Sequence, residues 1–153
     1  MDQELKRKTL VATAGGVMKA LHLDARTPAM CDLTYRTDDP EVVEMTITTF
    51  IETERGAHAE FTTWMVGRDL LNEGLSSQQP VGEGDIAVGY DYRHDQVVMV
   101  FTDGSERNPG GLRATHRLQL DGQPVRTFIR HCYLVMPEAH LDVDGFIADV
   151  LGQ

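Results

Sequence analysis

One stretch of the chain alternates apolar and polar side chains with the period of a β-strand, and this feature restricts the fold most. The apolar members are Val43, Met45, Ile47 and Ile51, and Glu44, Thr46 and Thr48 stand between them. Successive side chains of a strand point to opposite faces, so residues 42–51 are predicted to form a half-buried strand. The fold is therefore expected to contain a sheet with one face on the core.

Several other segments alternate in the same way, and short turns join some of them. Further strands are predicted at residues 17–23, 28–36, 60–66, 86–90, 97–102 and 112–120. Turn residues at 54–57 and 93–95 separate neighbouring strands by the spacing of a hairpin. The pairs that they join are therefore expected to be antiparallel.

Helical spacing replaces alternation at three places, two of them near the end of the chain. A short helix is predicted over residues 67–73, with Gly74 as its left-handed stop. A second begins at Pro124 and carries apolar residues through Cys132, and a third is capped by Asp142 or Asp144. The fold class is therefore α+β: a curled antiparallel β-sheet or barrel with a short mid-chain helix and two C-terminal helices.

Length and charge limit the classes of protein that fit. A chain of 153 residues is expected to form a single domain over residues 1–153, with residues 1–15 as a flexible N-terminal lead. Its 24 acidic residues against 14 Lys and Arg give a net charge of −10, which repels polyanions and argues against general nucleic-acid binding. The basic start at residues 6–8 precedes only a short apolar stretch broken by Gly15 and Gly16, so a cytoplasmic location without membrane insertion is expected.

The residues that could carry chemistry are few, and no catalytic residue, metal site or cofactor is predicted. The only cysteines, Cys31 and Cys132, are far apart in sequence and are expected to be buried free thiols. His94 lies in a hairpin turn among acidic residues, and His131 points about 100° away from its neighbour Cys132 on a helix. The glycine-rich segment 82–85 opens a strand and carries two acids, which excludes a phosphate loop.

The segment from Trp64 to Asp85 is the most specific pattern in the chain. A strand ending in Trp64 leads into Arg68-Asp69-Leu70-Leu71, a Gly74-Leu75 stop, Pro80 and the run Gly82-Glu83-Gly84-Asp85. This order resembles the SsgA-like family of actinobacterial sporulation and cell division proteins, and the resemblance covers residues 27–151. The chain departs from the family pattern in a longer N-terminal lead, a longer hairpin at 103–111, and Pro137-Glu138-Ala139 in place of proline followed by glycine.

The resemblance implies a function as well as a fold. It implies a non-enzymatic, cytoplasmic regulator of septum formation and sporulation that acts through protein partners at division septa. FtsZ, or a factor that recruits it, is among the partners that it implies. It also implies a homotrimer with a curled sheet similar to that of whirly single-stranded nucleic-acid binders. A single-stranded nucleic-acid binder and a small enzyme or ligand-binding domain are the alternatives.

Three groups of residues are candidates for binding. Arg68, Asp69, Glu83 and Asp85 form the first, either as a docking surface for partners or as part of the scaffold. Arg113, Arg117, Arg126 and Arg130 form the second, either a solvated face or a basic patch for an acidic tail or single strand. Phe146, Ile147, Val150 and Leu151 form the third, packed within the subunit or against another copy.

Overall fold

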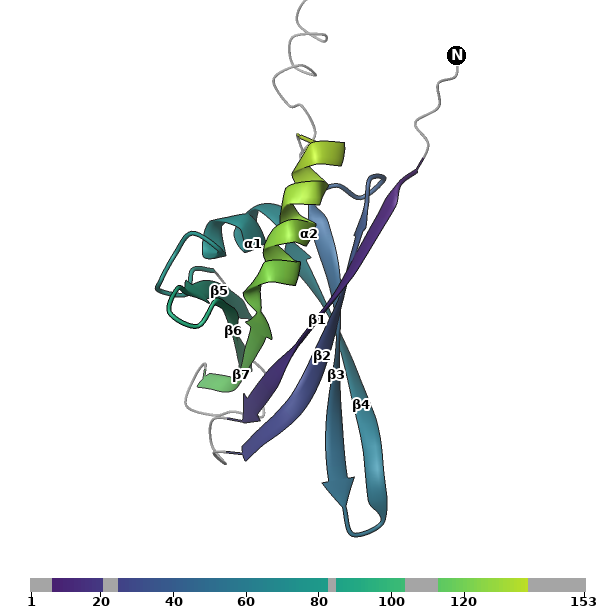
Figure 1. Cartoon of the computed structure of the whole chain (residues 1–153), viewed down its shortest axis with the longest axis vertical. Helices are drawn as coiled ribbons and strands as arrows, with labels where there is room; N and C mark the ends of the chain where they lie inside the picture. Colours follow the sequence, from purple (N-terminus) through teal and green to yellow (C-terminus); the bar gives the residue numbers. More distant parts are fainter. Residues whose placement is uncertain (1–6, 21–24, 83–84, 104–112, 138–153) are drawn as a thin grey trace, which may run out of the picture.

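A computed structural model of the chain describes residues 7–20, 25–82, 85–103 and 113–137. Seven strands form one sheet and two helices accompany it (Figure 1). The strands are β1 (Thr9–Ala20), β2 (Ala25–Arg36), β3 (Val42–Thr53), β4 (Gly56–Gly67), β5 (Ile86–Asp91), β6 (Gln96–Asp103) and β7 (Arg113–Asp121). The helices are α1 (Arg68–Gly74) and α2 (Gly122–Val135).

The sheet is entirely antiparallel and open. Its strand order is β4-β3-β2-β1-β7-β6-β5, so β4 and β5 are the edges and the sheet does not close into a barrel. The two halves of the sheet meet where β1 pairs with β7, over only five residues from Gly16 to Ala20. The sequence predicted either a curled sheet or a barrel, and the structure shows an open sheet and not a barrel. The likeness to whirly proteins stays a prediction.

Helix α2 lies over one face of the sheet and completes the core (Figure 1). Its buried side chains are Val125, Phe128, Ile129 and Cys132. They belong to the same buried cluster as Leu118 and Leu120 of β7, which point to the α2 side of the sheet. The apolar stripe predicted for this helix is confirmed. Both cysteines are free and buried, as expected.

Strand β1 corrects the expectation for the N-terminus. It starts at Thr9, so residues 9–15 belong to the sheet and are no flexible lead, and the strand predicted at 17–23 begins eight residues too late. The inward side chains of its first half are Leu10, Ala12 and Ala14, which are partly or fully buried. Two of these three are alanines, so the period-two signal is weak there although the positions face the core.

Helix α1 is present where the spacing predicts it, but it ends for another reason. Its C-cap is Leu75 with φ −66° in right-handed geometry, so Gly74 is no left-handed stop. A Cβ on Gly74 would lie 2.5 Å from Cγ1 of Val88 and 2.7 Å from its carbonyl oxygen. Glycine is needed there because α1 packs directly on β5.

The remaining expectations concern segments outside the described residues. The third helix, with Phe146, Ile147, Val150 and Leu151, falls there, and so does the hairpin at 104–112. In the part that is described, neither helix has the length and apolar character needed to cross a membrane.

Candidate partner-binding surface

Arg68 begins α1 as a buried residue. Its side chain is 1% exposed and its Nη1 donates hydrogen bonds to the hydroxyl oxygen of Tyr35, at 3.1 Å, and the carbonyl oxygen of Cys132, also at 3.1 Å. It also donates to the carbonyl oxygens of Met136 and Pro137, just past the end of α2. Arg68 therefore ties β2, α1 and α2 together, and its burial favours the scaffold role over the docking role among the two alternatives left open for it.

Asp69 lies beside this buried node but faces solvent. Its side chain is 69% exposed, and its carboxylate accepts a hydrogen bond from the hydroxyl of Tyr133 on α2. The Arg68 guanidinium stands 3.7 Å from the centre of the Tyr133 ring. Burial and the Asp69 carboxylate together raise the pKa of Tyr133 to about 12, so this hydroxyl stays protonated and keeps donating. Asp69 is thus held in place and remains accessible to a partner.

Of the two other acids in the predicted docking group, one is described. Asp85 is exposed just before β5, and its carbonyl oxygen accepts a hydrogen bond from the Thr102 N–H at 2.9 Å. Glu83 lies outside the described residues. The backbone of Asp85 is therefore fixed to β6 while its carboxylate is free to contact another protein.

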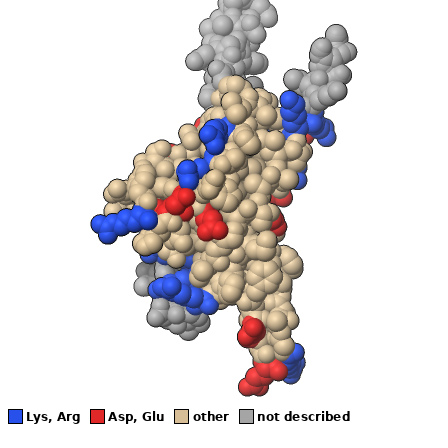
Figure 2. Space-filling model, viewed as in Figure 1, with Lys and Arg blue, Asp and Glu red and all other residues tan. Residues whose placement is uncertain are grey.

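Three of the four arginines proposed as a basic patch have described side chains, and these three do not lie on one surface. Arg117 alternates with Leu118, whose side chain faces α2, so Arg117 lies on the opposite face of the sheet. Arg126 and Arg130 lie on α2, and Arg126 holds both carboxylate oxygens of Asp95 at 2.9 Å. Figure 2 shows the basic side chains in separate groups on the visible face. The side chain of Arg113 is outside the described part, so the single basic patch is not found among the other three.

The histidines and cysteines that the structure describes form no catalytic constellation. His94 Nδ1 lies 2.8 Å from Asp91 in the exposed turn between β5 and β6, and the described residues contain no group of three side chains that could hold a metal ion. Burial raises the pKa of the Cys31 thiol to about 12 and that of the Cys132 thiol to about 12 as well. Neither thiol is therefore available as a nucleophile at neutral pH.

The turn between β5 and β6 gives a pH prediction. The Tyr90 hydroxyl and the Arg126 guanidinium bind Asp95 and hold the pKa of its carboxyl below the ordinary 3.8. A carboxyl whose pKa is lower in the folded than in the unfolded protein stabilises the fold fully when the pH is above its unfolded pKa. This contribution to stability is lost as the pH falls through the folded pKa. Asn tolerates the φ of 51° at this position, so Asp95→Asn removes the charge without backbone strain.

We therefore expect Asp95→Asn to lower Tm at about pH 6, and the difference from the native chain to narrow toward about pH 3. Circular dichroism melting curves across this pH range measure both quantities. A difference in Tm that stays constant over the range would contradict the assignment.

The exposed apolar side chains on the α2-free face of the sheet were not anticipated. Met30, Phe50, Phe61 and Met65 lie on β2, β3 and β4 and are between 42% and 69% exposed. Met30 and Phe61 flank Thr48, which pairs with both and is 9% exposed, and Met65 lies further along β4 opposite Glu44. We call these four apolar residues the apolar sheet face. Phe61 and Met65 lie on the strand face opposite to that of Trp64. They are four residues apart, and because an even separation places two strand residues on one face, this spacing was the sequence signal that could have predicted part of the apolar sheet face.

Comparisons with known proteins match the chain to a family and to two proteins named for sporulation and cell division. The family described as "Streptomyces sporulation and cell division protein, SsgA" matches residues 29–140. The chain is 31% identical over 131 residues to the sporulation-specific cell division protein SsgB of Kineococcus radiotolerans, covering 79% of this chain and 67% of that protein. It is 28% identical over 134 residues to SsgB of Streptomyces coelicolor, covering 85% and 87%.

Solved structures agree on the fold. A structure reported with mutations in SsgB that correlate to longitudinal cell division during sporulation of Streptomyces coelicolor matches with a TM-score of 0.60 at 24% identity, covering 90% of this chain and 94% of that one. The SsgA-like sporulation-specific cell division protein of Thermobifida fusca matches with a TM-score of 0.63 at 20% identity, covering 96% and 98%. From the sequence match and its extent, the chain belongs to the SsgA family of sporulation and cell division proteins.

Proposed function

We propose that this protein is a non-enzymatic adaptor in sporulation-specific cell division, which binds division proteins and assembles with copies of itself in the cytoplasm at the septum. The names of its relatives support a role in sporulation-specific cell division. The partners that we propose are FtsZ or its recruiting factors. A trimer is the proposed assembly.

The observation that carries this proposal is the apolar sheet face. Large apolar side chains gathered on one solvated sheet face are typical of surfaces that contact other proteins. Phe50 and Phe61 lie on the long β3–β4 hairpin, which projects from the rest of the fold (Figure 1), whereas Met65 lies near the base of that hairpin and Met30 on the neighbouring β2. Asp69 and Asp85 are exposed charges elsewhere on the molecule, and we propose them as separate contact points for a partner.

The nucleic-acid alternative has less support. Single-strand binding needs a continuous basic groove with aromatic side chains beside it. The described arginines are instead divided between the two sides of the sheet, and Arg126 is neutralised by Asp95.

The test is co-precipitation from an extract of a sporulating actinobacterium, with the tagged full chain as bait. The native chain is expected to recover division proteins identified by mass spectrometry. Phe61→Lys is expected to lower that recovery by about tenfold, since loss of a central apolar contact removes about 1–2 kcal/mol or more of binding energy. Asp85→Lys, at an exposed charge away from that face, is expected to lower it by a smaller factor. Their Tm values are expected to stay within about 2 °C of the native value.

The matched control is Leu134→Lys, which places the same charge at an apolar side chain that is 72% exposed on α2. Its recovery of division proteins is expected to equal that of the native chain. The adaptor role would be rejected if the native chain recovered no division protein. If all three variants lost the same amount of recovered division protein, Phe61 and Asp85 could not be the contact residues.

A further inference from the structure

Strand β1 has an open backbone edge over more than half its length, although it lies in the middle of the sheet. It pairs with β2 from Thr9 to Ala20, but with β7 only from Gly16 to Ala20. β7 ends at Asp121 because Gly122 begins α2. In the part of the chain that is described, no strand pairs with residues 9–15 on this side. About half of these residues therefore direct their N–H and C=O groups to a side without a strand partner.

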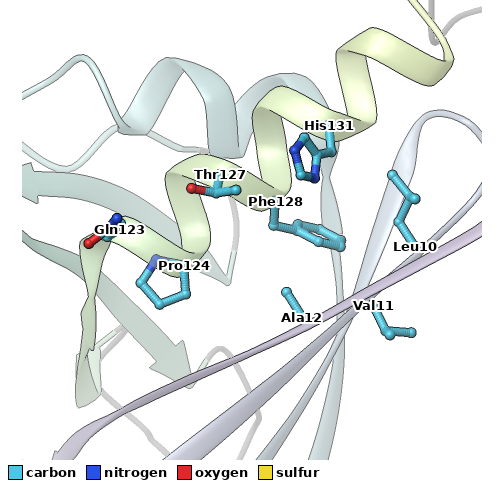
Figure 3. Close-up of a pocket in the computed structure, with 8 residues that line it drawn as sticks. All are labelled: Leu10, Val11, Ala12, Gln123, Pro124, Thr127, Phe128 and His131. Atoms are coloured by element: carbon cyan, nitrogen blue, oxygen red, sulfur yellow. The ribbon is translucent and has the colours of Figure 1, made fainter.

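Helix α2 turns this open edge into a groove. A hollow of about 450 Å³ lies between the helix and the first half of β1, within the range of binding pockets. In Figure 3, Ala12 of β1 and Phe128 of α2 point into the space between the two elements, and His131 lies at the end near Leu10. Val11 points to the other face and is 73% exposed. The groove thus has an apolar centre at Ala12, Pro124 and Phe128, with polar side chains at Gln123, Thr127 and His131, and is bordered by a hydrogen-bonding strand edge.

This edge lacks the devices that usually prevent strand edges from pairing with other chains. Natural edges are protected by charged side chains, prolines, bulges, a short length, or a helix or loop laid over them. Helix α2 stands beside this edge, but a hollow of about 450 Å³ separates the two. Residues 9–15 contain no charged residue and no proline, and β1 pairs with β2 in unbroken register. An unprotected edge next to an apolar wall is the arrangement to which extended peptides add as an extra strand.

We propose that the groove binds an extended segment of another protein, which adds to β1 as an antiparallel strand in line with β7. Side chains at every second position of that segment would face Phe128 and Pro124, which favours small apolar residues there. The charged residues at the two ends of the groove set the direction in which the segment binds. Asp121 is exposed at the β7 end, whereas Lys8 is exposed at the other end. The bound segment therefore has a basic residue before its apolar stretch and an acidic residue after it.

This site depends on β1 and α2 and uses neither the apolar sheet face nor Asp85. The adaptor proposal and the groove proposal can therefore each be rejected without the other. A second copy of the chain is the competing occupant of the groove, and the experiment distinguishes it.

The probe is a fluorescein-labelled peptide, Lys-Thr-Val-Thr-Val-Thr-Val-Glu, titrated with the full chain and followed by fluorescence anisotropy. Two further peptides carry N-methyl groups on the backbone nitrogens of all the valines or of all the threonines. Alternate N–H groups of a strand point to opposite sides, so only one of the two sets can donate to β1. We expect one methylated peptide to bind at least about tenfold more weakly than the unmodified peptide, and the other to bind equally well.

Protein variants locate the site. Thr127→Trp fills the groove from α2 and is expected to weaken binding at least about tenfold, since the peptide loses its wall contacts. Leu134→Trp adds the same side chain to the same helix at a residue outside the groove, and binding is expected to be unchanged. The proposal is overturned by no anisotropy change up to about 1 mM protein, by equal effects of the two methylated peptides, or by equal effects of the two variants. It is also overturned if light scattering shows that Thr127→Trp dissociates an oligomer, because a second copy would then occupy the groove.

Discussion

Replacing Arg68 with methionine is expected to lower the free energy of unfolding by about 3–5 kcal/mol. Methionine fills much of the same volume but donates no hydrogen bond. The carbonyl oxygens of Cys132 and Met136, and the hydroxyl of Tyr35, would then lose the guanidinium inside the protein. The Cys132 carbonyl keeps the Met136 N–H and the Tyr35 hydroxyl keeps the Pro40 carbonyl, but each hydrogen bond lost to a charged group costs about 1.5–3 kcal/mol. Urea denaturation followed by circular dichroism measures the loss.

Arg126→Met is the matched control. This arginine is 45% exposed and pairs with Asp95 at the surface, so its loss is expected to cost at most about 1 kcal/mol. Arg68→Lys is expected to recover only part of the lost stability, because one ammonium cannot reproduce the planar fork of donors. A loss below about 1 kcal/mol for Arg68→Met would contradict its role as the link between β2, α1 and α2.

Gly16→Ala is expected to lower the free energy of unfolding by about 3 kcal/mol or more, through overpacking of backbone against backbone. A Cβ at this position would lie 1.8 Å from the carbonyl oxygen of Gln119 and 2.8 Å from its carbonyl carbon. No side-chain rotation can relieve that contact, so β1 and β7 must separate. Gly16 opens the five-residue pairing that joins the two halves of the sheet. Chemical denaturation and two-dimensional NMR spectra measure the stability and the integrity of this pairing.

The neighbouring glycine supplies the control. A Cβ on Gly15 would meet nothing within 4 Å, so Gly15→Ala is expected to be neutral or to stabilise by about 0.5 kcal/mol, through lower backbone entropy of the unfolded chain. Equal effects of the two substitutions would mean that the close approach of β7 at Gly16 does not constrain the fold.

Much of the fold could be predicted because its signals are local. The alternation in β3 and the apolar stripe of α2 each report one buried face, and that face is set by the period of the element itself. The first half of β1 could not be found in this way. Two of its three inward residues are alanines, and their burial depends on α2, which lies more than a hundred positions later in the chain.

The candidate binding residues show the same limit more strongly. Arg68 and Asp69 are adjacent and both charged, yet one side chain is 1% exposed and the other 69%. Nothing in their local sequence distinguishes them, because the difference arises from the end of α2 and from Tyr35, which reach Arg68 through the tertiary fold. The arginines on β7 and on α2 were likewise locally aligned, but Arg117 lies on the face of the sheet opposite to α2, which carries Arg126 and Arg130.

By itself the sequence determined the class of fold, the positions of most strands and both described helices, and the family through the segment from Trp64 to Asp85. These depend on side-chain periodicity and on a motif, which are properties of neighbouring residues. Only the tertiary structure decided which charged groups are buried, where apolar side chains remain on the surface, and that β1 keeps an open edge beside α2. Each of these depends on which distant segments lie against a residue, and pairing over long separations is not encoded in any local pattern.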